Sequence, residues 1–107
     1  MSVELTRPPD GVTVDPAVSR AAYRIVQEAL TNAGKHAPGA AVAVAVEPSA
    51  GRLVVRVVNG PGHASEPAFG GGYGLVGLAE RVRTLGGRLT SQPRLDGGFE
   101  VEAELPA

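Results

Sequence analysis

The chain lacks cysteine and tryptophan, and aromatic residues make up only 4% of its 107 residues. The absence of cysteine excludes disulfide bonds and thiolate chemistry. Because bulky rings are scarce, the core must be built from Val, Leu, Ile and Ala, and we expect modest stability or support from a partner domain. Gly (15 residues) and Pro (9 residues) are instead abundant, which predicts prominent loops.

A large excess of either charge and long apolar runs are missing as well. The net charge of −1 lacks the basic excess of a nucleic-acid-binding domain, so no nucleic-acid partner is predicted. No apolar run is long enough to span a membrane and no signal segment opens the chain, so we expect a cytoplasmic location without direct membrane contact. With 43% hydrophobic and 20% charged residues, the composition predicts one soluble globular domain over residues 1–107.

Apolar residues recur with a helical period over Pro16–Ala37 and Leu75–Leu85, which predicts two amphipathic helices. Asp15 is a suitable N-cap for the first helix, and a proline occupies its first helical position. The Pro-Gly pair at 38–39 is expected to end the first helix, and the Gly-Gly pair at 86–87 the second.

Alternating apolar residues predict strands that form two hairpins and a short N-terminal region. The predicted strands are Ser2–Thr6, Val12–Val14, Ala41–Val46, Arg52–Val58, one opening at Leu89, and Phe99–Leu105. Residues 7–11, 47–51 and 96–98 are predicted turns, and residues 59–74 are too rich in Gly, Pro and Ser for regular structure. This order predicts an α+β fold, a two-layer α/β sandwich whose mixed, mostly antiparallel sheet has its helices on one face.

Glu28, Asn32 and Lys35 lie at i, i+4 and i+7 and therefore form one stripe on the first helix. An amide oxygen suits Mg²⁺, an ammonium group suits a phosphate, and a carboxylate can orient water or take a proton. The alternative is a solvated polar face, although such a position would favour Glu, Lys or Gln over Asn. His36 flanks the apolar face, where a partly buried packing role is the simpler interpretation.

The stretch "GGGYGL", residues 70–75, leads directly into the second helix. Gly70, Gly72 and Gly74 alternate, and unobstructed backbone N–H groups at a helix N-terminus can hold a phosphate. The stretch follows no strand and lacks the Gly-Lys-Ser/Thr of a P-loop, so the dinucleotide-binding and P-loop folds are disfavoured. A flexible hinge is the alternative interpretation.

Taken together, these segments resemble a known family. "RIVQEALTNAGKHA", residues 24–37, resembles the N-box of sensor histidine kinases of the subfamily that partners LuxR/NarL-type response regulators. "GGGYGLVGLAERVRTLGGRL" resembles the G2 box and following helix of that subfamily, and "GGFEVEAELP" resembles its closing strand. The resemblance covers residues 15–106 and implies the Bergerat (GHKL) fold, which binds Mg-ATP between helices and a lid.

The resemblance implies a catalytic role for Glu28 and Mg²⁺ coordination by Asn32. Lys35 and His36 match positions near the phosphates, and the alternating glycines match those that approach them. The full set of ATP-binding positions implied in this way is Asn32, Lys35, His36, Asn59, Gly62, Gly70, Gly72, Tyr73, Gly74 and Leu75.

Two positions depart from the family pattern. The G1 box usually reads Asp-x-Gly-x-Gly, with the Asp recognising the adenine amino group, but here the segment is "VVNGPGH". Matching the glycines puts Val58 at the Asp position, whereas strand alternation, with Val55 and Val57 inward, puts Asn59 there. Asn59 keeps an acceptor oxygen without the charge, so we expect weaker ATP binding. Phe99 stands where many relatives carry Thr, and we expect it to fill the core.

The resemblance thus implies the catalytic domain of a longer sensor histidine kinase, which binds Mg-ATP and donates the γ-phosphate to a His on a separate dimerisation domain. Neither His36 nor His63 lies in such a dimerisation segment. A degenerate module with weak or no nucleotide binding is one alternative, and a Ser kinase acting on an anti-anti-sigma partner is another. Residues 63–71 are expected to form a lid that is mobile without nucleotide.

Overall fold

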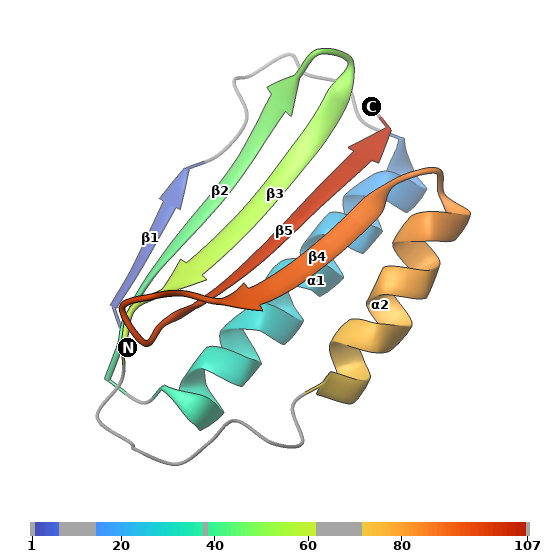
Figure 1. Ribbon diagram of the computed structural model, residues 1–107. Helices are drawn as coiled ribbons and strands as arrows, with labels where there is room; N and C mark the ends of the chain where they lie inside the picture. Colours follow the sequence, from blue (N-terminus) through green and yellow to red (C-terminus); the bar gives the residue numbers. More distant parts are fainter. Residues whose placement is uncertain (1, 7–14, 38, 62–71, 107) are drawn as a thin grey trace.

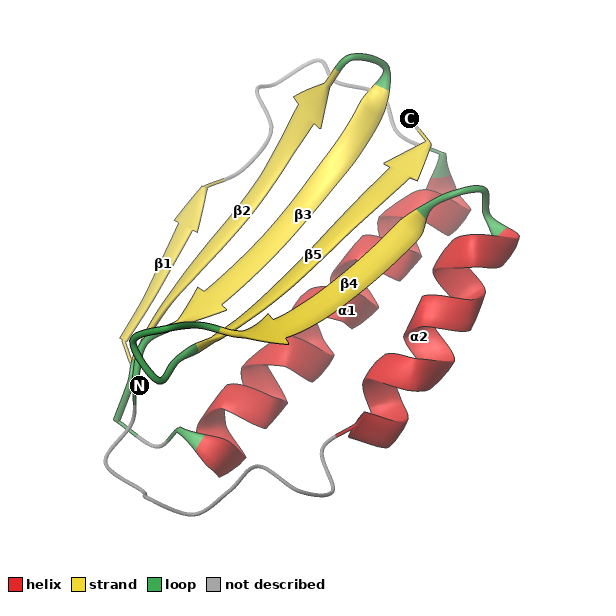
Figure 2. Cartoon of the chain, viewed as in Figure 1, coloured by secondary structure: helices red, strands yellow, loops and turns green. Residues whose placement is uncertain are grey.

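The fold is a single sheet covered on one face by two antiparallel helices (Figures 1 and 2). The computed structural model describes residues 2–6, 15–37, 39–61 and 72–106, with only the backbone described for residues 2–6, 36 and 72–74. The elements are β1 (Ser2–Thr6), α1 (Pro16–His36), β2 (Ala41–Ser49), β3 (Arg52–Asn59), α2 (Gly72–Thr84), β4 (Arg88–Pro93) and β5 (Phe99–Pro106).

The sheet has the strand order β1-β2-β3-β5-β4. β1 pairs in parallel with β2, and the other neighbouring strands are antiparallel. This arrangement confirms the predicted two-layer sandwich with a mixed, mostly antiparallel sheet and its helices on one face. The predicted turn at residues 7–11 and strand at Val12–Val14 lie outside the described residues.

Helix α1 begins where the capping residues predict. The Asp15 carboxylate accepts a hydrogen bond from the backbone N–H of Ala17 at 2.8 Å, and Pro16 starts the helix. The helix ends at His36, one residue before the predicted end, and the N–H of Ala37 still bonds to the carbonyl of Ala33. Neither described helix carries an apolar stretch long enough to cross a bilayer.

The core between helices and sheet is aliphatic, as expected from the scarcity of aromatic residues. Its largest fully buried side chains are Ile25, Leu105, Val44, Val55 and Val82. Phe99 packs partly buried against this cluster, which confirms the expectation that its ring contributes to the core. Small side chains let α1 lie close to the strands, with four alanines on its buried stripe, Ala21, Ala22, Ala29 and Ala33.

The first hairpin is tighter than predicted. β2 continues through residues 47–49 to Ser49, so the turn consists of Ala50 and Gly51 alone, not the five residues 47–51. Both turn residues have positive φ, 51° and 78°, as a two-residue hairpin turn of the primed type requires. Pro48 is tolerated in the strand because β1 pairs only with residues 41–45, which leaves β2 as an edge at this point.

Helix α2 begins at Gly72, three residues before the predicted start at Leu75. The residues from Gly72 to Gly74 are therefore the first turn of the helix and not part of the preceding loop. At the other end of the loop, Asn59 belongs to β3. The second predicted hairpin is confirmed, with its turn between Pro93 and Phe99.

Two glycines allow close backbone contacts near the two ends of β5. A Cβ on Gly87 would overlap the carbonyl oxygen of Glu104, near the end of β5, and would also press on Val82. A Cβ on Gly98 would overlap the carbonyl oxygen of Asn59, at the end of β3. Both positions therefore require glycine because the backbones approach too closely for a side chain.

Candidate functional site

The end of α1, the end of β3 and the start of α2, which were singled out in the sequence, lie toward the same end of the molecule (Figure 1). Figure 1 shows the last turns of α1, the end of β3 and the first turn of α2 at this end. The two helices pack against each other, and α1 also packs on β3. Residues 62–71, which join β3 to α2, lie outside the described residues, as do the predicted site residues Gly62 and Gly70.

The polar stripe of α1 runs from the half-buried edge of the helix toward solvent. Glu28 and Asn32 are half-buried, whereas Lys35 is exposed. Asn32 has an interaction partner in the structure. The side chain of His36 is not described. The stripe therefore places a carboxylate, an amide and an ammonium group in succession along the last turns of α1.

Asn59 is a buried polar residue at the end of β3. Leu53, Val55, Val57 and Asn59 alternate on the helix-facing side of this strand, as predicted, and Asn59 is only 8% exposed. Its Nδ2 donates a hydrogen bond to the carbonyl of Gly60 at 3.0 Å. Within the described part of the chain, no donor is bonded to its Oδ1. A buried acceptor without a donor is costly, so this oxygen is suited to receive an N–H group from a ligand.

The start of α2 places backbone N–H groups near the same end (Figure 1). Gly72, Tyr73 and Gly74 form its first turn, where helical N–H groups have no partner within the helix. Leu75 is buried and anchors this turn in the core. Leu75 therefore has a packing role in the structure, whereas the two glycines add no side chain beside the N–H groups, which suits the binding of an anion.

The β4–β5 turn braces Asn59, a contact that the sequence did not reveal. Gly98 lies against the Asn59 carbonyl, and its own N–H donates to Asp96 Oδ1 at 2.8 Å. Phe99 pairs directly with Asn59 across β5 and β3. The Asp-Gly-Gly run predicted only the turn itself, because which strand it would meet depends on the strand order.

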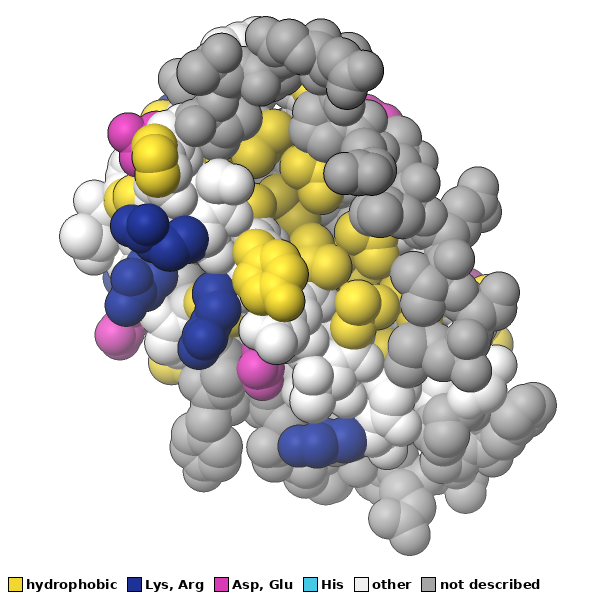
Figure 3. Space-filling view, turned by 180° about the vertical axis from the view of Figure 1, so that it is seen from behind, with side chains coloured by type: hydrophobic (Ala, Val, Ile, Leu, Met, Phe, Trp, Pro, Cys, Tyr) yellow, Lys and Arg dark blue, Asp and Glu magenta, His cyan; other side chains and the backbone are white. Residues whose placement is uncertain are grey.

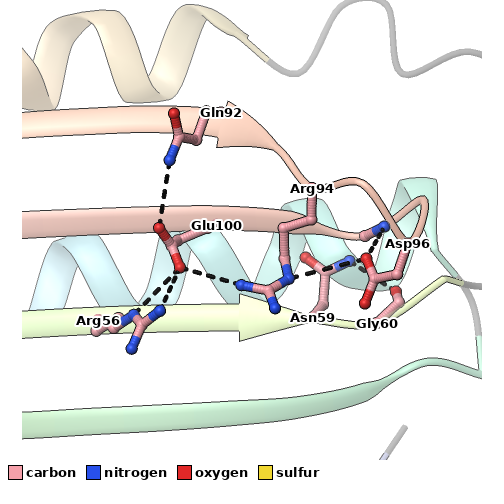
Figure 4. Close-up of polar contacts among 8 residues, drawn as sticks. Arg56, Asn59, Gly60, Gln92, Arg94, Asp96 and Glu100 are labelled. Atoms are coloured by element: carbon pink, nitrogen blue, oxygen red, sulfur yellow. Dashed lines mark hydrogen bonds and ion pairs between the residues drawn. The ribbon is translucent and has the colours of Figure 1, made fainter.

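A charged cluster ties the same turn to the outer face of the sheet (Figure 4). Glu100 accepts hydrogen bonds from Arg56 on β3, at 2.6 Å from Nη2 and 3.2 Å from Nε, and from Arg94 Nη1 at 3.2 Å. Gln92 reaches the other carboxylate oxygen at 3.5 Å. Arg94 also lies 3.8 Å from Asp96. The cluster joins β3, β4, β5 and the turn in one network.

The hydrogen bonds from Arg56 hold the pKa of the Glu100 carboxyl below its usual value, although its partial burial acts in the opposite direction. The hydrogen bond to Glu100 in turn raises the pKa of Arg56. Since the folded state favours the ionised carboxylate, its contribution to stability is fully present above the pKa of an unfolded glutamate. That contribution is lost as the pH falls through the lower pKa of the folded state.

We expect Glu100→Gln to make the melting temperature less dependent on pH under acidic conditions. Below about pH 4.3, the ordinary pKa of a glutamate, the melting temperature of the unchanged protein should fall more steeply than that of the variant. Thermal melts between about pH 3 and pH 7 measure this slope. The matched control is Glu102→Gln, whose carboxylate lies 3.9 Å from Arg56 and is more exposed. Equal slopes in the two variants would contradict the role assigned to Glu100.

The described residues hold no group of three or more His, Asp or Glu side chains that could bind a metal ion. Mg²⁺ bound with a nucleotide usually takes few protein ligands, with the remainder from phosphate oxygens and water. The amide oxygen of Asn32 and the carboxylate of Glu28, one turn apart on α1, are chemically suited to such a partial set.

Comparison with known proteins gives a consistent result. The family model described as "Histidine kinase-, DNA gyrase B-, and HSP90-like ATPase" matches residues 17–107. The sensor histidine kinase YxjM of Bacillus subtilis (strain 168) is 34% identical over 91 residues, which are 85% of this chain and 22% of that protein. The signal transduction histidine-protein kinase/phosphatase DegS of Brevibacillus brevis is 36% identical over 90 residues, 83% of this chain and 23% of that protein.

Among solved structures, the blue-light activated histidine kinase EL346 of Erythrobacter litoralis matches with a TM-score of 0.71 and 26% identity. The match covers 98% of this chain and 37% of that one. The chain thus spans less than a quarter of the length of the two curated relatives and just over a third of this structure.

Proposed function

This chain belongs to the family of histidine kinase-, DNA gyrase B- and HSP90-like ATPases, and we propose that it is the ATP-binding catalytic domain of a sensor histidine kinase. In this proposal it binds Mg-ATP and donates the γ-phosphate to a histidine on the dimerisation domain of the same kinase. The similarity to YxjM and DegS, both named as histidine kinases, supports this activity. The N-box stretch supports a response regulator of the LuxR/NarL type as the further partner, and we place the domain in the cytoplasm.

The observation that carries the proposal is the Oδ1 atom of Asn59. It is buried at the end of β3, and none of the described residues donates a hydrogen bond to it. The exocyclic amine of adenine is an N–H donor that would satisfy this oxygen. Asn59 also lies at the same end of the molecule as the polar stripe of α1 and the start of α2 (Figure 1). An adenine at β3 would therefore direct its phosphates toward the helices.

At the phosphate end, Asn32 would hold Mg²⁺, and Lys35 and His36 would lie near the phosphates. The backbone of residues 70–75, with its alternating glycines, would approach the same groups. Gly62 and Tyr73 complete the proposed site at the edges of the loop. Transfer forms a bond between the acceptor imidazole nitrogen and the γ-phosphorus as the bond to the leaving ADP oxygen breaks. The Glu28 carboxylate would polarise the attacking imidazole, while positioning and charge neutralisation supply most of the catalysis.

Two measurements test this function in order. Titration with a non-hydrolysable ATP analogue, with and without Mg²⁺, should give Mg²⁺-dependent binding tighter than about 1 mM. Labelled ATP should then transfer its phosphate to an added dimerisation-helix fragment in an acid-labile form, as a phosphohistidine. Acid-stable label on a serine of an anti-anti-sigma partner would instead identify a Ser kinase.

A degenerate module that acts through protein contacts is the second candidate. The observation that favours it is the G1 segment, where an amide stands in place of the usual carboxylate and the glycine spacing is altered. The analogue titration separates the two candidates, because a dissociation constant beyond about 1 mM, with or without Mg²⁺, would leave no catalytic role.

We expect Asn59→Asp to tighten nucleotide binding about 10-fold, because a carboxylate accepts a hydrogen bond more strongly than an amide. The change removes the hydrogen bond from Nδ2 to Gly60, so the free energy of unfolding should fall by about 1 kcal/mol. Calorimetric titration and chemical unfolding measure the two effects separately. Val58→Asp, one residue earlier and on the outer face, is the control that tests the alternative alignment. If nucleotide binding becomes tighter in Val58→Asp and not in Asn59→Asp, the residue that contacts adenine is at position 58 and not Asn59.

A further inference from the structure

The four arginines of the two helices have no acidic partner among the described residues. Arg20 and Arg24 on α1 and Arg81 and Arg83 on α2 are all exposed. No ion pair within the described part of the chain involves any of these four arginines. Exposed arginines without partners are available to a ligand that supplies carboxylates or phosphates.

The sheet is organised in the opposite way. Two of its three arginines have acidic partners, since Arg56 pairs with Glu100 and Glu102, and Arg88 pairs with Glu104 at 3.6 Å. The third, Arg52, donates a hydrogen bond to the carbonyl of Gly86. By sequence the two helices carry five basic and two acidic residues, whereas the five strands carry three basic and five acidic ones. The near-zero net charge of the chain therefore conceals a positively charged helical layer over a negatively charged sheet.

The four arginines lie away from the proposed nucleotide site. Because the helices are antiparallel, the first turns of α1 lie at the same end as the last turn of α2, opposite to the end that holds Asn32 and Asn59 (Figure 1). Figure 3 shows basic side chains gathered on one side of the helical face, beside an uncovered hydrophobic area. This basic region, which we call the arginine face, is therefore a separate surface.

A groove on α1 adjoins the arginine face. Pro16, Ser19, Arg20, Tyr23 and Arg24 line it, and its volume is about 520 Å³. Tyr23 is 67% exposed, although it is the bulkiest side chain on the helix. Arg20 and Arg24 are one helical turn apart, about 6 Å along the axis, so they match two carboxylates at the same spacing on another helix. An exposed ring beside paired cations is a combination typical of protein-binding surfaces.

We propose that the arginine face and its groove bind an acidic protein segment. Two carboxylates, one helical turn apart, pair with Arg20 and Arg24, and an apolar side chain of the segment covers Tyr23. Arg81 and Arg83 extend the favourable field toward α2. A polyanion such as a nucleic acid fits less well, because Glu28 and Glu80 interrupt the positive surface and the groove beside Tyr23 requires an apolar group.

The test uses a helical peptide of about 15 residues that carries glutamates at i and i+4 and one leucine, and a control peptide with lysines in place of the glutamates. Titration into the isotope-labelled chain, followed by NMR, should shift the amide signals of residues 16–24 and 81–83 for the acidic peptide alone. Raising the salt from about 50 mM to about 500 mM should weaken this binding, since exposed charges are screened.

Charge-reversed variants make the test specific. Arg20→Glu combined with Arg24→Glu should raise the dissociation constant of the acidic peptide about 10-fold or more. Arg52→Glu combined with Arg88→Glu changes the net charge by the same amount, but both residues lie on the sheet. This pair should change the dissociation constant of the acidic peptide by less than about 2-fold. Equal weakening by both pairs would overturn the proposal, because the effect would then reflect net charge alone. Tighter binding of a DNA duplex or of anionic phosphatidylglycerol vesicles at the same arginines, without a preference for the acidic peptide, would also overturn it.

Discussion

Replacing Asn32 with alanine is expected to remove the Mg²⁺-dependent part of nucleotide binding and to raise the dissociation constant of Mg-ATP about 100-fold, equivalent to about 2.7 kcal/mol. The amide oxygen is the only hard ligand that Asn32 can offer, and the methyl group of alanine offers none. The fold should persist, because alanine favours a helix more than asparagine does. The expected result is therefore a loss of the metal effect in a chain that melts normally.

Calorimetric titration of Mg-ATP and of ATP with chelator measures this effect. Asn32→Asp keeps an oxygen ligand in place and should retain most of the Mg²⁺ dependence. Gln27→Ala, on the exposed face of the same helix, should leave both affinities unchanged. If Asn32→Ala binds Mg-ATP as tightly as the unchanged chain, Asn32 does not coordinate the metal.

Gly98→Ala is expected to lower the free energy of unfolding by about 2–4 kcal/mol, which corresponds to roughly 10–20 °C in melting temperature. The new Cβ would overlap the carbonyl oxygen of Asn59, and that oxygen belongs to the backbone, so no side-chain rotation can relieve the contact. Either β5 must separate from β3 or the turn that holds Asp96 must move. Both responses disturb the end of β3, so weaker nucleotide binding should accompany the loss of stability.

Thermal and chemical unfolding of the variant measure this cost. Gly60→Ala is the matched control, because it follows Asn59 directly and a Cβ there meets no described residue within 4 Å apart from its two chain neighbours. That control should change stability by less than about 0.5 kcal/mol. A Gly98→Ala chain as stable as the Gly60→Ala chain would show that the approach of the two strands is looser than the structure indicates.

Features with local causes could be predicted from the sequence. The start of α1 follows from the Asp15 carboxylate and the proline after it, because capping involves neighbouring residues only. The alternation of Val55 and Val57 likewise predicted which side of β3 is buried, and with it the inward direction of Asn59. Each of these features depends on a few adjacent residues.

Features set by pairing between distant segments could not be predicted. The position of β5 between β3 and β4, and the parallel pairing of β1, depend on the whole sheet. Pro48 suggested a loop, yet it lies in a strand because β1 is too short to reach it. The glycines of the first turn of α2 also suggested a loop, because glycine has a low helix propensity. In the structure, the packing of Leu75 and Val82 outweighs that propensity.

The candidate site shows the same division. The stripe of Glu28, Asn32 and Lys35 is a property of one helix and was visible in its spacing. By contrast, the bracing of Asn59 by Gly98 and its pairing with Phe99 join residues about forty positions apart, and no spacing rule connects them.

The two close glycine contacts also decide how β5 is aligned. Its sequence repeats a glutamate at every second position, with an apolar residue between, so a slip by two residues would preserve both the buried and the charged face. The side chains along the strand therefore distinguish poorly between these alignments. The contact of Gly98 with Asn59 and that of Gly87 with Glu104 lie at opposite ends of β5. Both contacts fit in one alignment of the strand, so together they oppose a slip in either direction. The register of a uniformly patterned strand is thus fixed at its ends, by residues that carry no side chain.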